Sequence, residues 1–152
     1  MKIGIDYGHT LKGYDTGARG SGLKEQDITR EVGEIVTSKL RVLGHTVIEC
    51  AIDSANSVDE SLSYRANKAN SNNVDLFISI HVNAGGGQGV EIYMSHNPTF
   101  AAARKVLNNI TALGFNNRGI KDGSNLYVIR NTKAKAMLIE LFFIDSIDVE
   151  IY

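Results

Sequence analysis

The sequence predicts a single α/β domain with a central, mostly parallel twisted sheet that is flanked by helices on both faces. The first observation is a set of short runs rich in isoleucine and leucine, at 3–7, 76–80 and 137–139, which are typical of strands buried on both faces. The second is the alternation of such runs with segments of helical periodicity, which favours a layered fold. The third is the length of 152 residues, which suits one ordinary domain.

The first half of the chain supplies a strand, a long loop, a helix, a strand and a second helix. The loop from Lys12 to Gly22 is rich in glycine, and long loops of this kind in compact domains are commonly functional. Apolar residues then recur every three or four positions from Gln26 to Leu43, which predicts a helix that ends at Gly44. A strand at Thr46–Cys50 follows, and residues 57–60 have the pattern of a capping box that opens a helix.

The second half continues the alternation. Asn97 and Pro98 are typical of an N-cap and a first helical residue, and they predict a helix that extends to Leu113. The chain ends soon after its last apolar run, where a sheet covered on both faces would normally have one more helix. We therefore expect that residues 1–152 lack the final helix of the domain, or that another chain covers the exposed face. The strands expected in this half are Val74–His81, Val90–Met94, Leu126–Ile129 and Met137–Phe142.

Composition argues against several classes of protein. The net charge of −1 does not fit a nucleic-acid-binding surface, and no apolar stretch approaches the roughly 20 residues that span a membrane. The N-terminus enters a strand at once, without the apolar segment of a secretory signal peptide, so we expect synthesis in the cytoplasm without such a signal. The single cysteine, Cys50, follows an apolar run and is interpreted as a small buried hydrophobic residue.

Three residues occupy positions where a metal site would form. His9 and His81 each follow an apolar run, and ligands gather beyond the carboxyl ends of parallel strands. Catalytic zinc sites commonly combine three His, Glu or Asp ligands with one open position. Glu25, at the start of the first helix, is the candidate third ligand, and a carboxylate there also suits the helix dipole. The alternative is an ordinary acid in a first helical turn.

Glu140 ends the third apolar run and is followed by further apolar residues, so we expect its carboxylate to be desolvated. Desolvation raises a carboxyl pKa and suits the group to general acid–base chemistry. The alternative is a buried acid with a purely structural role. Two imidazoles and this carboxylate at one edge of a sheet predict a metal-assisted hydrolase.

Other polar residues are weaker candidates. Asn83, two residues after His81, could support that ligand or orient a substrate amide. Arg65 lies on a predicted helix, where a surface charge is the default expectation, and substrate binding or support of the site is the alternative. His45, in a helix-to-strand turn, and His96, just before a helix, are not expected to bind metal.

Eight short segments in a fixed order contain most of these residues. They are 5–9 (IDYGH), 15–18 (DTGA), 22–25 (GLKE), 62–67 (LSYRAN), 77–84 (FISIHVNA), 89–93 (GVEIY), 117–121 (NRGIK) and 138–140 (LIE). Together they resemble the zinc-dependent N-acetylmuramoyl-L-alanine amidases of the type-3 amidase family, which includes phage endolysins. The resemblance covers nearly the whole chain, and its specificity comes from the order of the segments.

This resemblance implies one zinc ion per chain, bound by His9, Glu25 and His81, with Glu140 as the catalytic carboxylate. The implied reaction is hydrolysis of the amide between N-acetylmuramic acid and L-alanine in bacterial peptidoglycan, for phage-mediated lysis of the host. The enzyme would act on the wall after release from the cytoplasm, and a C-terminal wall-binding domain could have been removed. Two alternatives stay open: a catalytically inactive wall-binding module, and a zinc peptidase that cuts within the stem peptide.

Overall fold

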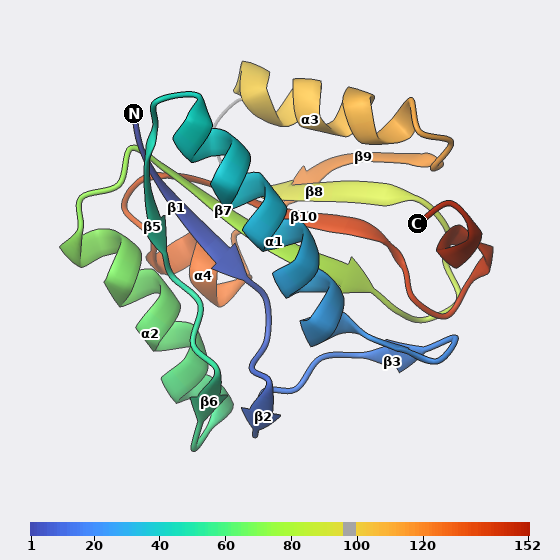
Figure 1. Ribbon diagram of the computed structural model, residues 1–152, viewed down its shortest axis with the longest axis horizontal. Coiled ribbons are helices and arrows are strands. Elements are labelled where there is room, and N and C mark those ends of the chain that lie inside the picture. Colours follow the sequence, from blue (N-terminus) through green and yellow to red (C-terminus); the bar gives the residue numbers. More distant parts are fainter. Residues whose placement is uncertain (96–99) are drawn as a thin grey trace.

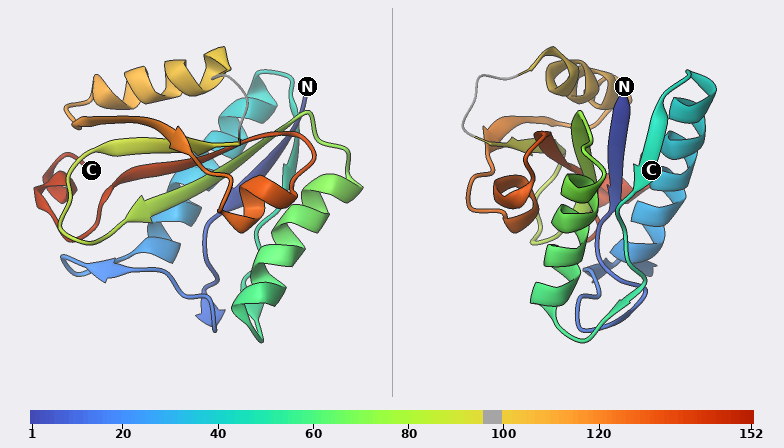
Figure 2. Two further views of the ribbon diagram at one scale, coloured as in Figure 1. Left: turned by 180° about the vertical axis from the view of Figure 1, so that it is seen from behind. Right: turned by 90° about the vertical axis from the view of Figure 1, so that its left-hand side faces the viewer.

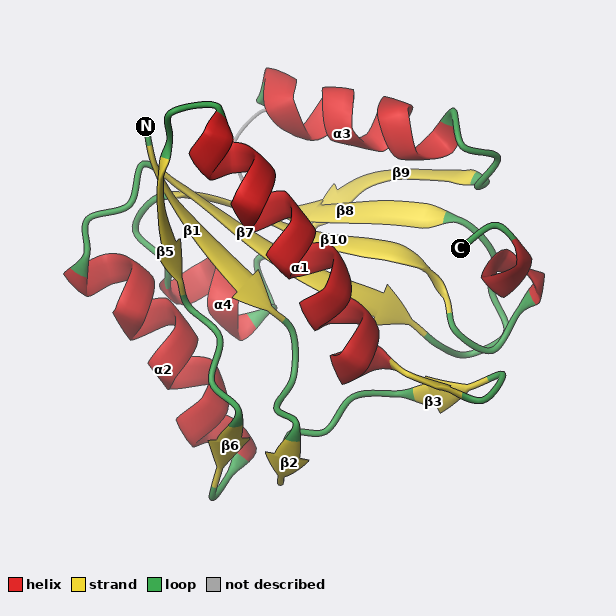
Figure 3. Ribbon diagram, viewed as in Figure 1, coloured by secondary structure: helices red, strands yellow, loops and turns green. Residues whose placement is uncertain are grey.

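The computed structural model describes residues 1–95 and 100–152, in which strands and helices alternate along the chain (Figure 1, Figure 3). Over these ranges the central sheet has six strands in the order β5-β1-β7-β10-β8-β9. The elements are β1 (Lys2–Tyr7), β2 (Lys12–Gly13), β3 (Arg19–Gly20), β4 (Leu23–Lys24), α1 (Glu25–Val42), β5 (Thr46–Glu49), β6 (Ser54–Ala55), α2 (Val58–Ser71), β7 (Leu76–Asn83), β8 (Val90–Met94), α3 (Ala101–Thr111), β9 (Asn117–Asp122), α4 (Tyr127–Asn131), β10 (Lys135–Phe143) and the 3₁₀ helix η1 (Ile147–Glu150).

The sheet is mostly parallel, which confirms the predicted fold class. Strands β5, β1, β7 and β10 run in the same direction, whereas β8 is antiparallel to β10 and β9 is parallel to β8. Helices α1 and α3 pack on one face, and α2 and α4 pack on the other, so the domain has three layers (Figure 2). The carboxyl ends of the four parallel strands therefore lie at one edge of the sheet.

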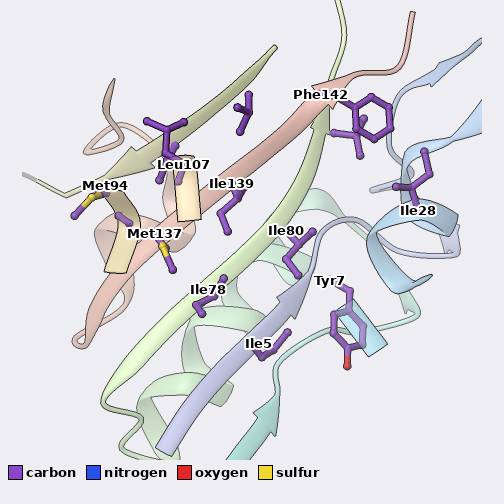
Figure 4. Close-up of a cluster of buried hydrophobic side chains, with 14 of the residues drawn as sticks. Ile5, Tyr7, Ile28, Ile78, Ile80, Met94, Leu107, Met137, Ile139 and Phe142 are labelled. Atoms are coloured by element: carbon purple, nitrogen blue, oxygen red, sulfur yellow. The ribbon is translucent and has the colours of Figure 1, made fainter. Parts of the chain in front are cut away.

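Alternate residues of the central strands face opposite helix layers. Ile78, Ile80 and Ile139 belong to the larger core, beneath α1 and α3, where Figure 4 shows them along neighbouring strands. Phe77 and Leu138 belong to the smaller core, beneath α2 and α4. Burial on both faces explains why these strands are continuous apolar runs rather than alternating ones.

The predicted helix ends are mostly where the sequence placed them. The Ser57 hydroxyl accepts a hydrogen bond of 3.0 Å from the Glu60 N–H at the start of α2, as in a capping box. The Glu60 carboxylate instead accepts from the N–H of Asn56, one residue before the cap. Gly44, just after α1, has a φ of +82°, in the left-handed region that favours glycine.

In the second half, one predicted strand is wrong and one strand was missed. Residues 126–129 were expected to form a strand, but Tyr127–Asn131 form the helix α4. A short run of apolar, β-branched residues does not distinguish a strand from a buried helix, and here Val128 and Ile129 are buried in the smaller core beside α2. The polar edge strand β9, Asn117–Asp122, was not predicted. Asn97 and Pro98, the expected start of the third helix, lie outside the described residues.

An apolar groove of about 420 Å³ lies between α1, α3 and the C-terminal segment, and it is lined by residues that include Val36, Val106 and Tyr152. From the sequence we expected an exposed face that a further helix or a partner chain would cover, without saying which face, and that expectation stays a prediction. Across residues 1–95 and 100–152, no helix is long and apolar enough to cross a bilayer.

Candidate metal centre

The topology brings the residues that end β1, β7 and β10 together. β7 lies between β1 and β10 in the sheet, and Glu140 is the direct register partner of His81. His9 follows the end of β1 by two residues, and Glu25 is the first residue of α1. The carboxyl edge of the parallel strands therefore carries two imidazoles and a carboxylate, with Glu140 one strand away.

The geometry of His9, Glu25 and His81 fits a mononuclear metal ion. One ligand atom from each lies within 4.8 Å of the others. His9 Nε2 is 3.2 Å from Glu25 Oε2, and His81 Nδ1 is 3.1 Å from Glu25 Oε1. Two ligands bonded to a tetrahedral zinc ion at about 2.0 Å lie about 3.3 Å apart. Each imidazole therefore lies at this separation from one oxygen of the Glu25 carboxylate, and the two histidines approach different oxygens.

The backbone fixes the Glu25 carboxylate in place. The N–H of Ala18 donates to Oε2 at 2.9 Å, and the N–H of Val82 donates to Oε1 at 3.0 Å. Burial alone would raise the pKa of Glu25, but His81 and His9 outweigh burial and hold that pKa well below its usual range. The group is therefore an oriented, ionised carboxylate, which is the form that binds a metal.

A second carboxylate orients His9. With its proton on Nδ1, His9 donates to Asp15 Oδ1 at 3.0 Å, which directs Nε2 toward Glu25. Asp15 in turn accepts a 2.6 Å hydrogen bond from the Ser61 hydroxyl. Burial lowers the pKa of His9, but the hydrogen bonds to Asp15 and Glu25 outweigh this effect and raise it to about 10. The surroundings of His9 thus strongly favour positive charge.

The backbone around His9 is held by two arginines. His9 has a φ of +64°, a conformation that is unfavourable for a residue other than glycine. Its carbonyl accepts hydrogen bonds from Arg65 at 2.7 Å and from Arg30 at 3.2 Å. Arg65 is also ion-paired with Asp6 and is only 1% exposed, so the expectation of a surface charge is wrong. The Arg65 side chain is thus enclosed within the domain, against the backbone of His9.

Two glycines allow the ligands to approach the backbone closely. A Cβ on Gly8 would lie 2.5 Å from the ring of His81. A Cβ on Gly17 would lie 2.7 Å from Glu25 Oε2 and 2.9 Å from the ring of His9. Any larger residue at either position would displace a candidate ligand. Asp15 and these glycines were not singled out as site residues from the sequence, although the motif around residues 15–18 contains two of them.

Glu140 has the environment expected of a general base. Its Oε2 is buried and has no hydrogen-bond partner among the described residues. Burial raises the pKa of this carboxyl, His81 lowers it and Glu25 raises it further, so that the result is about 7. The predicted desolvation and upward pKa shift are therefore confirmed. A carboxyl group that titrates near neutral pH exchanges a proton readily under physiological conditions.

The structure gives the remaining candidates no direct part in this centre. Asn83 donates from Nδ2 to Glu91 at 2.8 Å and accepts from the N–H of Ala84 at 2.9 Å, so both ends of its amide are engaged. His45 lies in the turn between α1 and β5, next to the amino ends of the strands rather than their carboxyl edge. His96 lies outside the described residues.

A mostly parallel α/β sheet with such a cluster at its carboxyl edge, beside a buried carboxyl group, is typical of metal-dependent hydrolases. Residues 3–151 match the family described as N-acetylmuramoyl-L-alanine amidase. The chain therefore belongs to this family, as the resemblance predicted.

Individual relatives agree with this assignment. An endolysin from Bacillus phage SPP1 is 36% identical over 155 residues, which cover 96% of this chain and 56% of the relative. The N-acetylmuramoyl-L-alanine amidase CwlM from Bacillus licheniformis is 34% identical, with 96% and 58% covered. The solved catalytic domain of the CD27L endolysin targeting Clostridia difficile superposes with a TM-score of 0.88 at 29% identity, covering 100% of this chain and 87% of that one. This chain thus spans just over half the length of the two curated relatives.

Proposed function

We propose that this chain is a zinc-dependent hydrolase that cleaves the amide between N-acetylmuramic acid and L-alanine in bacterial peptidoglycan. The observation that carries the proposal is the placement of Glu140, with a pKa near 7, in direct register with His81 of the three-ligand cluster. Membership of the amidase family supports the choice of bond. The set of ligands formed by His9, Glu25 and His81 suits zinc, because imidazole and carboxylate leave a fourth position for water or substrate.

The protein's own groups then have distinct tasks. Zinc in this cluster would supply Lewis acidity, polarising the scissile carbonyl and making bound water more acidic. Helix α1 positions Glu25, and strand β7 positions His81. Asp15 keeps the proton of His9 on Nδ1 so that Nε2 can bind. Glu140 accepts a proton from the attacking water and returns it to the leaving amine nitrogen of L-alanine. One water is consumed, and the products are the lactyl carboxylate and a free stem peptide.

Glu140→Gln tests the proposal most simply. The variant should keep its zinc and lose about 10²- to 10⁴-fold in kcat/KM, since it can no longer accept the proton. Glu34→Gln, an exposed acid on α1, is the matched control and should leave the rate unchanged. Activity is measured as the release of stem peptide from purified peptidoglycan. A near wild-type rate in Glu140→Gln would show that Glu140 is not the base.

The products separate the amidase from the alternatives. An amidase frees intact stem peptides with an N-terminal alanine, whereas a peptidase acting within the stem releases fragments with other termini. A wall-binding module would sediment with peptidoglycan and release nothing. For the biological role, we infer an endolysin-like part in wall lysis, which the similarity to the SPP1 endolysin supports. Loss of turbidity when the purified protein is added to permeabilised cells tests that role.

A further inference from the structure

A row of charged residues continues across the sheet from the metal cluster. His81 on β7 is in register with Glu140 on β10, and Glu140 is in register with Glu91 on β8. Residues directly opposite on neighbouring strands point to the same face of a sheet, so all three side chains share one face. Glu91 therefore stands beside Glu140, on the side away from the metal cluster.

Glu91 holds neighbouring polar side chains in place and does not serve as a second general acid or base. It is 2% exposed, and its carboxylate accepts hydrogen bonds from Asn83, Tyr93 and Arg118, at 2.8, 2.9 and 2.7 Å, and from Lys121. Burial would raise its pKa, but the hydrogen bonds from Lys121, Arg118 and Tyr93 outweigh this and hold it at about 2. The group stays ionised across the pH range in which the reaction would run.

Two cations on β9, Arg118 and Lys121, pair with the single negative charge of Glu91. One positive charge balances the Glu91 carboxylate, yet both Arg118 and Lys121 are paired with it. Their side chains are 36% and 37% exposed, whereas that of Glu91 is 3% exposed. The Arg118 guanidinium also lies 4.8 Å from the centre of the Phe143 ring, which restrains it further. A surplus positive charge is thus held in a fixed position and open to solvent.

The distance from Glu140 matches the length of a short peptide. Glu91, with which both cations pair, lies directly opposite Glu140 on the neighbouring strand, and neighbouring strands are about 4.8 Å apart, so the charged groups lie about 5–8 Å from Glu140. An extended chain spans about 3.3–3.6 Å per residue, so one or two residues beyond the first cover this distance. A peptide that leaves the scissile amide along this face would bring its second or third residue to the cations.

We propose that Arg118 and Lys121 form a carboxylate-binding subsite that recognises a free carboxylate on the second or third residue of the stem peptide. The inference rests on the proposed amidase function and adds the specificity for the peptide side of the bond. Stem peptides offer such groups when the second residue is isoglutamate rather than isoglutamine, or the third is diaminopimelate rather than lysine. Paired charges of this kind favour a carboxylate over its neutral amide.

Four soluble muramoyl peptides test the subsite: isoglutamate or isoglutamine at the second residue, each combined with diaminopimelate or lysine at the third. The wild type should cleave the peptides with the recognised carboxylate with a kcat/KM about tenfold or more above that for their neutral counterparts. Lys121→Met and Arg118→Met should lose that preference, because the KM for the peptides with the recognised carboxylate rises toward the KM for their neutral counterparts. Each variant leaves one cation on Glu91, so the buried carboxylate stays paired.

Lys135→Met, at the opposite end of β10, is the matched control and should keep the wild-type preference. A preference for isoglutamate over isoglutamine would show that the subsite binds the second residue of the stem peptide. A preference for diaminopimelate over lysine would show that it binds the third residue. Either preference supports the proposal. Equal cleavage of all four peptides by the wild type overturns the subsite and leaves the amidase function standing. Cleavage of none overturns the proposed function, and the subsite with it.

Discussion

Replacement of Arg65 by methionine should destabilise this protein far more than replacement of an exposed arginine. Arg65 lies inside the domain and donates to the Asp6 carboxylate, to the carbonyls of Tyr7 and His9 at 2.7 Å, and to the Ser61 hydroxyl at 3.1 Å. Methionine has a similar length but no donor. The Asp6 carboxylate, which is 0% exposed, would then keep the Ser79 hydroxyl as its hydrogen-bond donor and lose its charged partner.

Removal of one partner from a buried ion pair costs about 3–5 kcal/mol, because an uncompensated charge is left inside. The matched control is Arg41→Met, since Arg41 pairs with Glu49 at 2.7 Å while their side chains are 53% and 46% exposed. Exposed pairs of this kind contribute about 0–1 kcal/mol. Urea unfolding of the two variants, after treatment with a chelator, measures the difference without a contribution from metal binding.

A result in which both variants lose the same stability, within about 1 kcal/mol, would refute this reasoning. It would mean that loss of Arg65 does not leave an uncompensated charge inside the domain. The double variant Asp6→Asn with Arg65→Met provides a further check, since it removes both charges together. It should recover part of the loss seen in Arg65→Met, because the buried charge that carried the penalty is gone.

Two further predictions concern the other carboxylates around the site. Asp15→Ala should weaken zinc binding about 10- to 100-fold, because His9 loses the acceptor that orients it, and a competition titration with a chromogenic chelator measures this. For Glu91, the folded-state pKa of about 2 lies below the value near 4.5 of the unfolded chain, so its stabilisation is complete above about pH 4.5 and is lost as pH falls through about 2. The stability difference between wild type and Glu91→Gln should therefore be at most about 3 kcal/mol near pH 5 and shrink toward pH 2, and a pH-independent difference would contradict the assigned ionisation.

The sequence was informative wherever one residue pattern has one structural solution. Buried parallel strands demand continuous apolar runs, so the strands at 76–83 and 135–143 were recognisable. The run at 126–129 was not, because four apolar residues satisfy a buried helix as well as a strand, and packing against α2 decided between them. The edge strand β9 has a single large apolar residue, Ile120, which packs against the larger core, and one such residue does not make a strand pattern.

Some of the site residues could also be recognised from the sequence, and others could not. His9, His81 and Glu140 were recognisable because each stands at the end of an apolar run, where the topology of a parallel sheet brings them together. The buried role of Arg65 depends on Asp6, 59 residues away, and no local pattern reveals that pairing. Glu91 carried a readable sign, a charge inside the apolar strand Val90–Met94, which implies that cations from elsewhere neutralise it.

Metal content is the decisive measurement for the proposal that His9, Glu25 and His81 together hold one zinc ion. Elemental analysis is performed on protein purified without chelator, for the native chain, His81→Ala and the control His45→Ala, whose histidine lies away from the cluster. We expect one zinc per chain in the native protein and in His45→Ala, and none in His81→Ala. A native protein that takes up no zinc even when zinc is added, or a His81→Ala variant that keeps its full complement, would contradict it.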